Sequence, residues 1–247
     1  MIILNEKARQ NMLGNIIVVS GVFLLGTTMS VIEVQADGMN SGVYSTDEKP
    51  YGLTYGEWTA KWWQWLISIP QDVNPVGDPT GRYCGQNQTG PVWFLVGTSG
   101  GTAERTCEIP AGKAILFPVL TTECSYLESP AFKTESDLRT CAKQAQDAGS
   151  RTMAASINGT QLKNLEDYRV DSQLFDLTFP ENNLFSTPPG KTKAVSDGFW
   201  VFLGPLPNGN YDIDHSGSVL DPSGVNSYNT HAKYQLTVKP INSTDPI

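Results

Sequence analysis

Four of the six tryptophans in this chain lie between Trp58 and Trp65. Tryptophan buries more area than any other side chain, and its indole N–H needs a hydrogen-bond partner when it is buried. Thr54 and Glu57 match a Ser/Thr-x-x-Glu capping box, so the pattern predicts a helix that begins there and ends before Pro70. A cluster this dense serves either as the anchor of a hydrophobic core or as a platform for a ligand.

The spacing of these tryptophans favours the core. Trp58, Trp62, Trp65 and Ile69 follow an i, i+4, i+7, i+11 pattern, which places them in one stripe along a helix. Trp63 lies roughly 100° away from Trp62 around the helix and falls outside that stripe.

Residues 1–36 have the features of a targeting segment. Lys7 and Arg9 supply a positive region, an apolar stretch follows over residues 12–32, and Val34-Gln35-Ala36 offers a cleavage site. We favour a cleaved signal peptide. The alternative is an uncleaved membrane anchor, because the apolar stretch approaches the ~20 residues that span a bilayer. Both interpretations predict that the body of the protein is secreted or lies at the cell surface.

The rest of the chain is the right size for one domain with a substantial core. Residues 37–50 are polar and show no periodicity, so we expect a flexible leader there, followed by a domain over residues 51–240 and a tail over residues 241–247. The net charge of −8 and the lack of a basic run exclude nucleic-acid binding.

All four cysteines follow the targeting segment, at Cys84, Cys107, Cys124 and Cys141. An even number of cysteines in an oxidising compartment favours two disulfides, for which three pairings exist. Cys84 and Cys107 flank an expected hairpin, and Cys124 and Cys141 flank a polar loop with a short helix, so we predict these two pairs. A zinc site is disfavoured because no CxxC or CxxH pair is present.

Short apolar runs bounded by glycine and proline predict a mainly β fold. Residues 91–97 and 104–110 read as two strands joined by a glycine-rich turn, and residues 113–120 as a buried strand. A second helix is expected over residues 135–148 and a hairpin turn at Asn158-Gly159. Further strands are expected over residues 171–180, 198–203, 211–218 and 230–238. The fold class is therefore a disulfide-stapled β-sandwich with one or two packed helices, whose inner face receives the tryptophan helix.

Several stretches together resemble an uncharacterised family of secreted prokaryotic proteins with a YGxxYGEWxxKWWQW motif. The motif corresponds to residues 51–65, and the resemblance continues through residues 78–84, 90–95, 106–124, 197–209 and 234–238. It implies secretion and a largely β fold, and it supplies no activity. Where the family has a Gly-x-His-x-Ile strand, this chain has Gly209-Asn-Tyr-Asp-Ile213, so Tyr211 replaces the histidine.

Gly97-Thr-Ser-Gly-Gly101 matches the letters of a nucleophile elbow around Ser99. An elbow needs a strand-to-helix turn, and here a second strand is expected after the motif. A catalytic triad would have to combine Ser99 with His215 or His231 and a carboxylate. A glycine-rich hairpin explains the motif better.

His215, His231 and Asp214 form a candidate site for a divalent or copper ion, because imidazole and carboxylate ligands suit such metals. We expect both histidines on neighbouring antiparallel strands. Alternation along the strand weakens this hypothesis, because His215 and Asp214 then point to opposite faces. The alternative is a set of polar side chains on the solvent face of a hairpin, with no cofactor.

Glycoside hydrolysis would need two carboxyl groups roughly 5 to 10 Å apart. Glu57, Glu123 and Asp78 flank aromatic or cysteine landmarks and are the candidates. For Glu57 we prefer a helix cap. For Glu123, beside Cys124, we prefer a structural role or a hydrogen-bond acceptor.

Carbohydrate binding is the strongest non-enzymatic hypothesis. Sugars stack on aromatic rings, so exposed Trp63, Trp93 or Tyr83 would form a binding platform. The leading function is accordingly a secreted or cell-envelope protein that binds a carbohydrate or another surface component. An extracellular hydrolase or metal-dependent enzyme using His215, His231 and nearby carboxylates is the first alternative, and a structural subunit of a surface assembly is the second.

The glycosylation sequons at Asn87, Asn158 and Asn242 predict surface loops.

Overall fold

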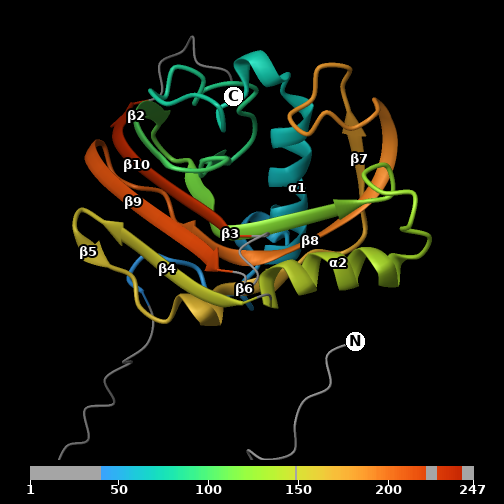
Figure 1. Cartoon of the computed structure of the whole chain (residues 1–247). Helices are drawn as coiled ribbons and strands as arrows, with labels where there is room; N and C mark the ends of the chain where they lie inside the picture. The colour runs from blue at the N-terminus through green and yellow to red at the C-terminus, as the bar shows by residue number, and fades with distance from the viewer. Residues whose placement is uncertain (1–39, 148, 221–226, 241–247) are drawn as a thin grey trace, which may run out of the picture. The chain divides into compact units, whose positions relative to one another are not determined.

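The computed structural model describes residues 40–147, 149–220 and 227–240. The targeting segment 1–36, the tail 241–247 and the sequon at Asn242 lie outside these ranges. The described residues form a mainly β sandwich of two five-stranded sheets with two α-helices, as the sequence predicts (Figure 1). No helix among the described residues combines the length and apolarity needed to cross a membrane.

The described residues form the following α-helices, 3-10 helices (labelled η) and strands, given in chain order. They are η2 (Pro50–Gly52), α1 (Tyr55–Ser68), η3 (Gln71–Val73), β1 (Val92–Phe94), β2 (Thr102–Pro110), β3 (Ala114–Ser125), α2 (Glu135–Asp147), β4 (Ser150–Ile157), β5 (Thr160–Gln161), η4 (Leu165–Tyr168), β6 (Arg169–Asp171), β7 (Phe175–Phe179), β8 (Gly190–Leu203), β9 (Gly209–Leu220) and β10 (Tyr228–Lys239).

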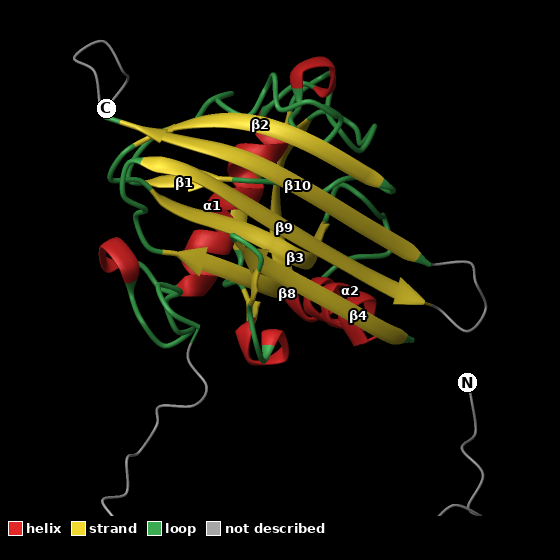
Figure 2. Cartoon of the chain, turned by 90° about the vertical axis from the view of Figure 1, so that its left-hand side faces the viewer, coloured by secondary structure: helices red, strands yellow, loops and turns green. Residues whose placement is uncertain are grey.

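Both sheets are mixed. The first has the order β1-β3-β8-β6, with β7 also paired to β8, and β1 runs parallel to β3. The second has the order β2-β10-β9-β4-β5, with β2 parallel to β10. Figure 2 shows β2, β10, β9 and β4 of the second sheet side by side. The predicted hairpin turn at Asn158-Gly159 joins β4 to β5, and both residues have the positive φ that a tight turn requires.

The hairpin expected between residues 91–97 and 104–110 is wrong. β1 and β2 belong to different sheets, so the glycine-rich segment 97–101 is a crossover from one sheet to the other. Alternation of apolar residues cannot distinguish these arrangements, because each strand buries a face in either one.

The tryptophan helix packs on the outer face of the first sheet, and the expectation that it lies against the inner face is also wrong. Residues of α1 form a hydrophobic core with Leu116, Trp200 and Phe202, whereas Phe117 and Val201 belong to a second core between the sheets. β3 and β8 are therefore buried on both faces. This explains their continuous apolar runs, which are typical of strands covered on two sides.

Each tryptophan of α1 is buried and its indole N–H has an acceptor. Trp58 donates to Pro50 O, Trp62 to Leu95 O and Trp65 to Gln86 O, over 2.8, 2.9 and 2.9 Å. The predicted capping box is present, with Thr54 and Glu57 satisfying each other's backbone N–H groups. The helix is thereby anchored to three separate segments of chain.

Residues 40–50, the described part of the predicted flexible leader, contact the domain. Val43 is buried and forms a bridge with Leu203, and Tyr44 N donates to Phe202 O over 2.8 Å. Several isolated backbone and side-chain contacts of residues 40–44 hold this segment, and they leave no periodic signal in the sequence.

Candidate functional site

Two disulfides attach the long loop before β1 to the second sheet and α2 to the first sheet. They join Cys84 to Cys107 and Cys124 to Cys141, the pairs that the sequence predicts. The first holds the long loop before β1 against β2. The second holds α2 against β3, so that the C-terminal end of α2 lies beside the end of that strand.

A cavity of about 1070 Å³ lies beside this second disulfide. Its walls come from α1, η3 and the loop after it, the crossover after β1, β3 and the turn after it, α2, the loop before β8, β9 and β10. This volume lies just above the range for small-molecule sites, about 300–1,000 Å³. The residues that line the cavity include Trp63, Asp72, Thr121, Glu123, Glu128, Gln146, Phe185 and Tyr228.

The pairing of β3 with β8 is irregular where β3 lines this cavity. The register with β8 shifts between Pro118 and Leu120, as in a β-bulge. Gly217 makes the shift sterically feasible, because a Cβ there would lie 2.5 Å from Leu120 Cγ and 2.6 Å from Val119 O. Beyond the bulge, the apolar residues of β3 are followed by the polar residues 121–123, which line the cavity.

The two threonines after the bulge position groups from both helices. Thr121 Oγ1 accepts a hydrogen bond from Trp63 Nε1 over 3.4 Å. Thr122 Oγ1 accepts one from Gln146 Nε2 of α2 over 2.7 Å. The other polar atom of that amide, Gln146 Oε1, is buried and has no hydrogen-bond partner in the structure. Gln146 therefore presents an unused acceptor.

Two carboxyl groups, Glu123 and Glu128, lie against each other in the cavity wall. Ser125 donates its backbone N–H and its hydroxyl to Glu128 Oε2, over 2.7 and 2.8 Å. A hydroxyl has one hydrogen, so Ser125 leaves nothing to donate to Glu123. Both carboxyl oxygens of Glu123 are buried without a donor.

Burial and the adjacent carboxyl raise the pKa of Glu123 well above its usual range. Burial also raises the pKa of Glu128, but the hydrogen bonds from Ser125 oppose that effect. The pair therefore shares one proton, held by Glu123, while Glu128 is the carboxylate.

Aromatic rings form another wall of the cavity. Trp63 packs edge-on against Trp62, with ring centroids 5.0 Å apart, and lies 6.3 Å from the ring of Phe185. Phe185 is 40% exposed, and Trp63 only 6%. One ring is thus anchored in the core and the other faces solvent.

The three aromatic residues expected to form a platform are not brought together. Trp63 lines the cavity, but Trp93 is buried in the core between the sheets. Tyr83 lies in the long loop before β1, beneath the guanidinium of Arg82 at 5.5 Å.

The residues of the predicted metal site lie on two faces of the second sheet. His231 Nε2 and Asp214 Oδ1 form a pair at 2.9 Å on the outer face. His215 is fully buried on the inner face, stacked on Tyr234 and tilted against Phe117. Burial lowers the pKa of His215 to about 3, so the ring is neutral. No cluster of three or more candidate metal ligands occurs among residues 40–147, 149–220 and 227–240.

Ser99 is exposed on the crossover and lines the cavity. Within the described ranges it forms no side-chain hydrogen bond with either histidine. The strand-to-helix turn of a nucleophile elbow is also absent there, because β2 follows the motif.

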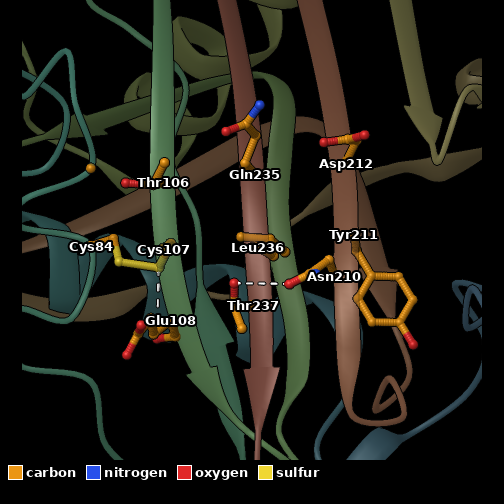
Figure 3. A pocket seen from close by; sticks show the side chains of 11 residues that line it. Cys84, Thr106, Cys107, Glu108, Asn210, Tyr211, Asp212, Gln235, Leu236 and Thr237 are labelled. Carbon is orange, nitrogen blue, oxygen red and sulfur yellow. Dashed lines mark hydrogen bonds between the residues drawn. A yellow bond between two sulfur atoms is a disulfide. The ribbon is translucent and has the colours of Figure 1, made fainter.

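A second hollow, of about 580 Å³, lies over β2, β10 and β9 beside the Cys84–Cys107 disulfide. Figure 3 shows Tyr211 at one edge of it and a hydrogen bond between Thr237 and Asn210. None of its described lining atoms is a buried polar atom without a partner. The larger cavity is the better candidate site because it does contain such atoms.

Sequence reasoning singled out Glu123 but missed Glu128, Gln146 and Phe185. A signal for Glu128 exists in Ser125-Tyr-Leu-Glu128, whose Ser-x-x-Glu spacing matches the turn in which Ser125 binds that carboxylate. Gln146 and Phe185 reach the cavity through tertiary packing alone.

No protein-family model matches the chain, and no curated protein does. A solved structure described as "Structure of PbICP-C in complex with falcipain-2" aligns with 61% of this chain and 100% of that chain, at 13% identity and a TM-score of 0.22. A similarity this low carries no argument about fold or function. The family resemblance described above therefore stays a prediction.

Proposed function

We propose that this protein is a non-enzymatic binding protein of the extracellular space or cell surface, and that it holds a carbohydrate in the large cavity. The observation that carries the proposal is the pair of buried, donor-free acceptors there, on Glu123 and Gln146. Leaving a buried polar group unsatisfied costs about 1–3 kcal/mol. A ligand with several hydroxyl groups supplies the missing donors.

The aromatic wall supports the same ligand class. Trp63 and Phe185 line the cavity with their rings 6.3 Å apart, and the apolar face of a sugar packs on aromatic rings. The exposed large hydrophobic side chains within the described ranges are Tyr51, Phe185, Leu220 and Tyr228. Two of these four, Phe185 and Tyr228, line the cavity. Apolar exposure is therefore concentrated where a ligand would bind, and this favours binding over a structural role in a surface assembly.

Two features of the chain support a location in the extracellular space or at the cell surface. Two disulfides are typical of proteins that fold in an oxidising compartment. The charge and apolarity of residues 1–36 are those of a targeting segment.

An extracellular enzyme has less support. The carboxyl groups of Glu123 and Glu128 are in contact, whereas glycosidases keep their two carboxyl groups roughly 5 to 10 Å apart, across the bond that breaks. His215 and His231 lie on opposite faces of their sheet, so they do not act on one substrate.

Isothermal titration calorimetry of the purified protein with a panel of mono- and oligosaccharides tests the proposal. We expect at least one saccharide to bind with a Kd below about 1 mM, equivalent to ~4 kcal/mol. Phe185→Ala should weaken that binding at least ~10-fold, whereas Tyr51→Ala, an exposed aromatic outside the cavity, should not. Absence of binding across the panel would overturn the proposed function.

A further inference from the structure

The charge of the cavity is one-sided. Three acidic residues line it, namely Asp72, Glu123 and Glu128, and no lysine, arginine or histidine is among its described lining residues. The residues of α2 that line it, 144–146, are uncharged. An anionic ligand would meet only like charge here, whereas a cation would find a partner.

The acceptors in the cavity match the donors of a protonated amine. Glu128 supplies the ionised carboxylate, Glu123 an oxygen without a donor, and Gln146 its free Oε1. Gln146 is only 2% exposed and its Nε2 donates to Thr122 Oγ1, so this acceptor is separate from the acidic pair. A primary ammonium group has three N–H donors and no acceptor.

The aromatic wall provides a second attraction for a cation. The faces of Trp63 and Phe185 carry partial negative charge, and a desolvated cation over such a ring is attracted to it. A neutral sugar gains nothing from this term.

We infer that the ligand of the cavity carries a primary ammonium group, as an amino sugar does, and that this group binds between Glu128, Glu123 and Gln146. The inference rests on the proposed function, because it specifies the class of carbohydrate. Glu128 acts as the counter-ion, while Glu123 contributes a hydrogen bond in its neutral form. The ammonium group and Glu128 then form one ion pair, and no proton needs to be released. Asp72, the third acidic residue of the lining, is outside this pair.

The two carboxyls thus have different roles, which isosteric variants separate. Glu123→Gln keeps a neutral acceptor at its position. Glu128→Gln removes the counter-ion, and burial, the largest cause of the raised pKa of Glu123, remains in this variant. Both variants preserve the size of the side chain, and thermal unfolding checks that each is folded.

The experiment is calorimetry near pH 7 with glucosamine oligomers and with N-acetylglucosamine oligomers of the same length, which lack the charge. We expect the amino form to bind at least ~10-fold more tightly, or ~1.4 kcal/mol. Glu128→Gln should abolish this preference and Glu123→Gln should retain most of it.

Three outcomes would overturn the inference. Equal affinity for the charged and neutral oligomers would show a neutral ligand and leave the proposed function intact. A preference that survives Glu128→Gln would place the ammonium group elsewhere. Absence of binding by either oligomer class and by the whole saccharide panel would overturn the inference and the proposed function together.

Discussion

Ser125 donates both its backbone N–H and its hydroxyl to Glu128 Oε2, over 2.7 and 2.8 Å. This double contact makes Glu128 the carboxylate of the pair and leaves Glu123 as the group that holds the proton. The turn over residues 125–128 therefore determines which of the two carboxyl groups is charged. Both groups line a cavity whose walls include both helices and the crossover between the sheets.

The first prediction concerns the buried carboxyl of Glu123. Its pKa is raised in the folded state, so as pH rises above the usual 4.5 the unfolded chain ionises while the folded chain keeps the proton. The free energy of unfolding contributed by this group is therefore largest in acid and falls with rising pH. Glu123→Gln should remove that fall, so its stability gain over the natural protein should grow as pH rises above 4.5, as measured by chemical denaturation.

Glu108→Gln is the matched control, because Glu108 is exposed and pairs with Lys239 on the surface. It should change stability by less than about 1 kcal/mol at any pH. A Glu123→Gln gain that does not vary with pH would contradict the assigned protonation.

The second prediction concerns His215. Its pKa falls from the usual 6.5 to about 3 because burial opposes the charged ring. Its contribution to stability is complete above pH 6.5 and is lost as pH falls towards 3, because the unfolded chain takes up the proton first. His215→Phe should remove this acid sensitivity in pH-dependent unfolding experiments. His231→Gln, on the outer face, should not. Equal acid sensitivity in the His215 variant and the natural protein would refute this account.

The third prediction concerns Arg105, which is 2% exposed and hydrogen-bonds with backbone carbonyls and Tyr234. Its guanidinium ties Asp78 O, in the long loop, to Val96 O and Gly97 O, where the crossover begins. Arg105→Met leaves several buried carbonyls without donors, at about 1–3 kcal/mol each, so we expect a total loss of at least ~3 kcal/mol. Arg82→Met, an exposed arginine in the same loop, should cost less than about 1 kcal/mol. Urea denaturation measures both, and similar losses would contradict this role of Arg105.

Much of the fold follows from the sequence because its signals are local. The capping box of α1, the turn at Asn158-Gly159 and both disulfide pairs depend on residues near one another in the chain. The assignment of β1 and β2 to different sheets does not, because pairing partners 20 to 130 residues away decide it.

The candidate site shows the same division. Glu123 stands out beside Cys124, and Ser125 with Glu128 forms a recognisable turn. Gln146 reaches the cavity because apolar packing and the Cys124–Cys141 disulfide together hold α2 on β3 and β8. Trp63 falls outside the tryptophan stripe in sequence, yet it is buried because Phe185 and Thr121 cover it.

The fourth prediction concerns that disulfide. It closes a loop with a sequence separation of 17, so replacing both Cys124 and Cys141 by alanine should cost about 3 kcal/mol. Because α2 then keeps only its noncovalent packing on β3 and β8, Gln146 is held less firmly and saccharide affinity should fall as well. Replacing Cys84 and Cys107, whose separation is 23, should cost similar stability and leave the preference for the amino form. Calorimetric binding and thermal unfolding of the two double variants separate these effects.

The most direct test of a ligand in the large cavity is a two-dimensional NMR titration of the tryptophan indole N–H signals with glucosamine oligomers. Trp63 Nε1 bonds Thr121 at the cavity wall, whereas Trp58 Nε1 bonds Pro50 O away from it. We predict a saturable shift of the Trp63 signal while the Trp58 signal stays in place. Binding that leaves Trp63 unmoved, or that shifts both signals equally, would contradict the assignment of this cavity as the binding site.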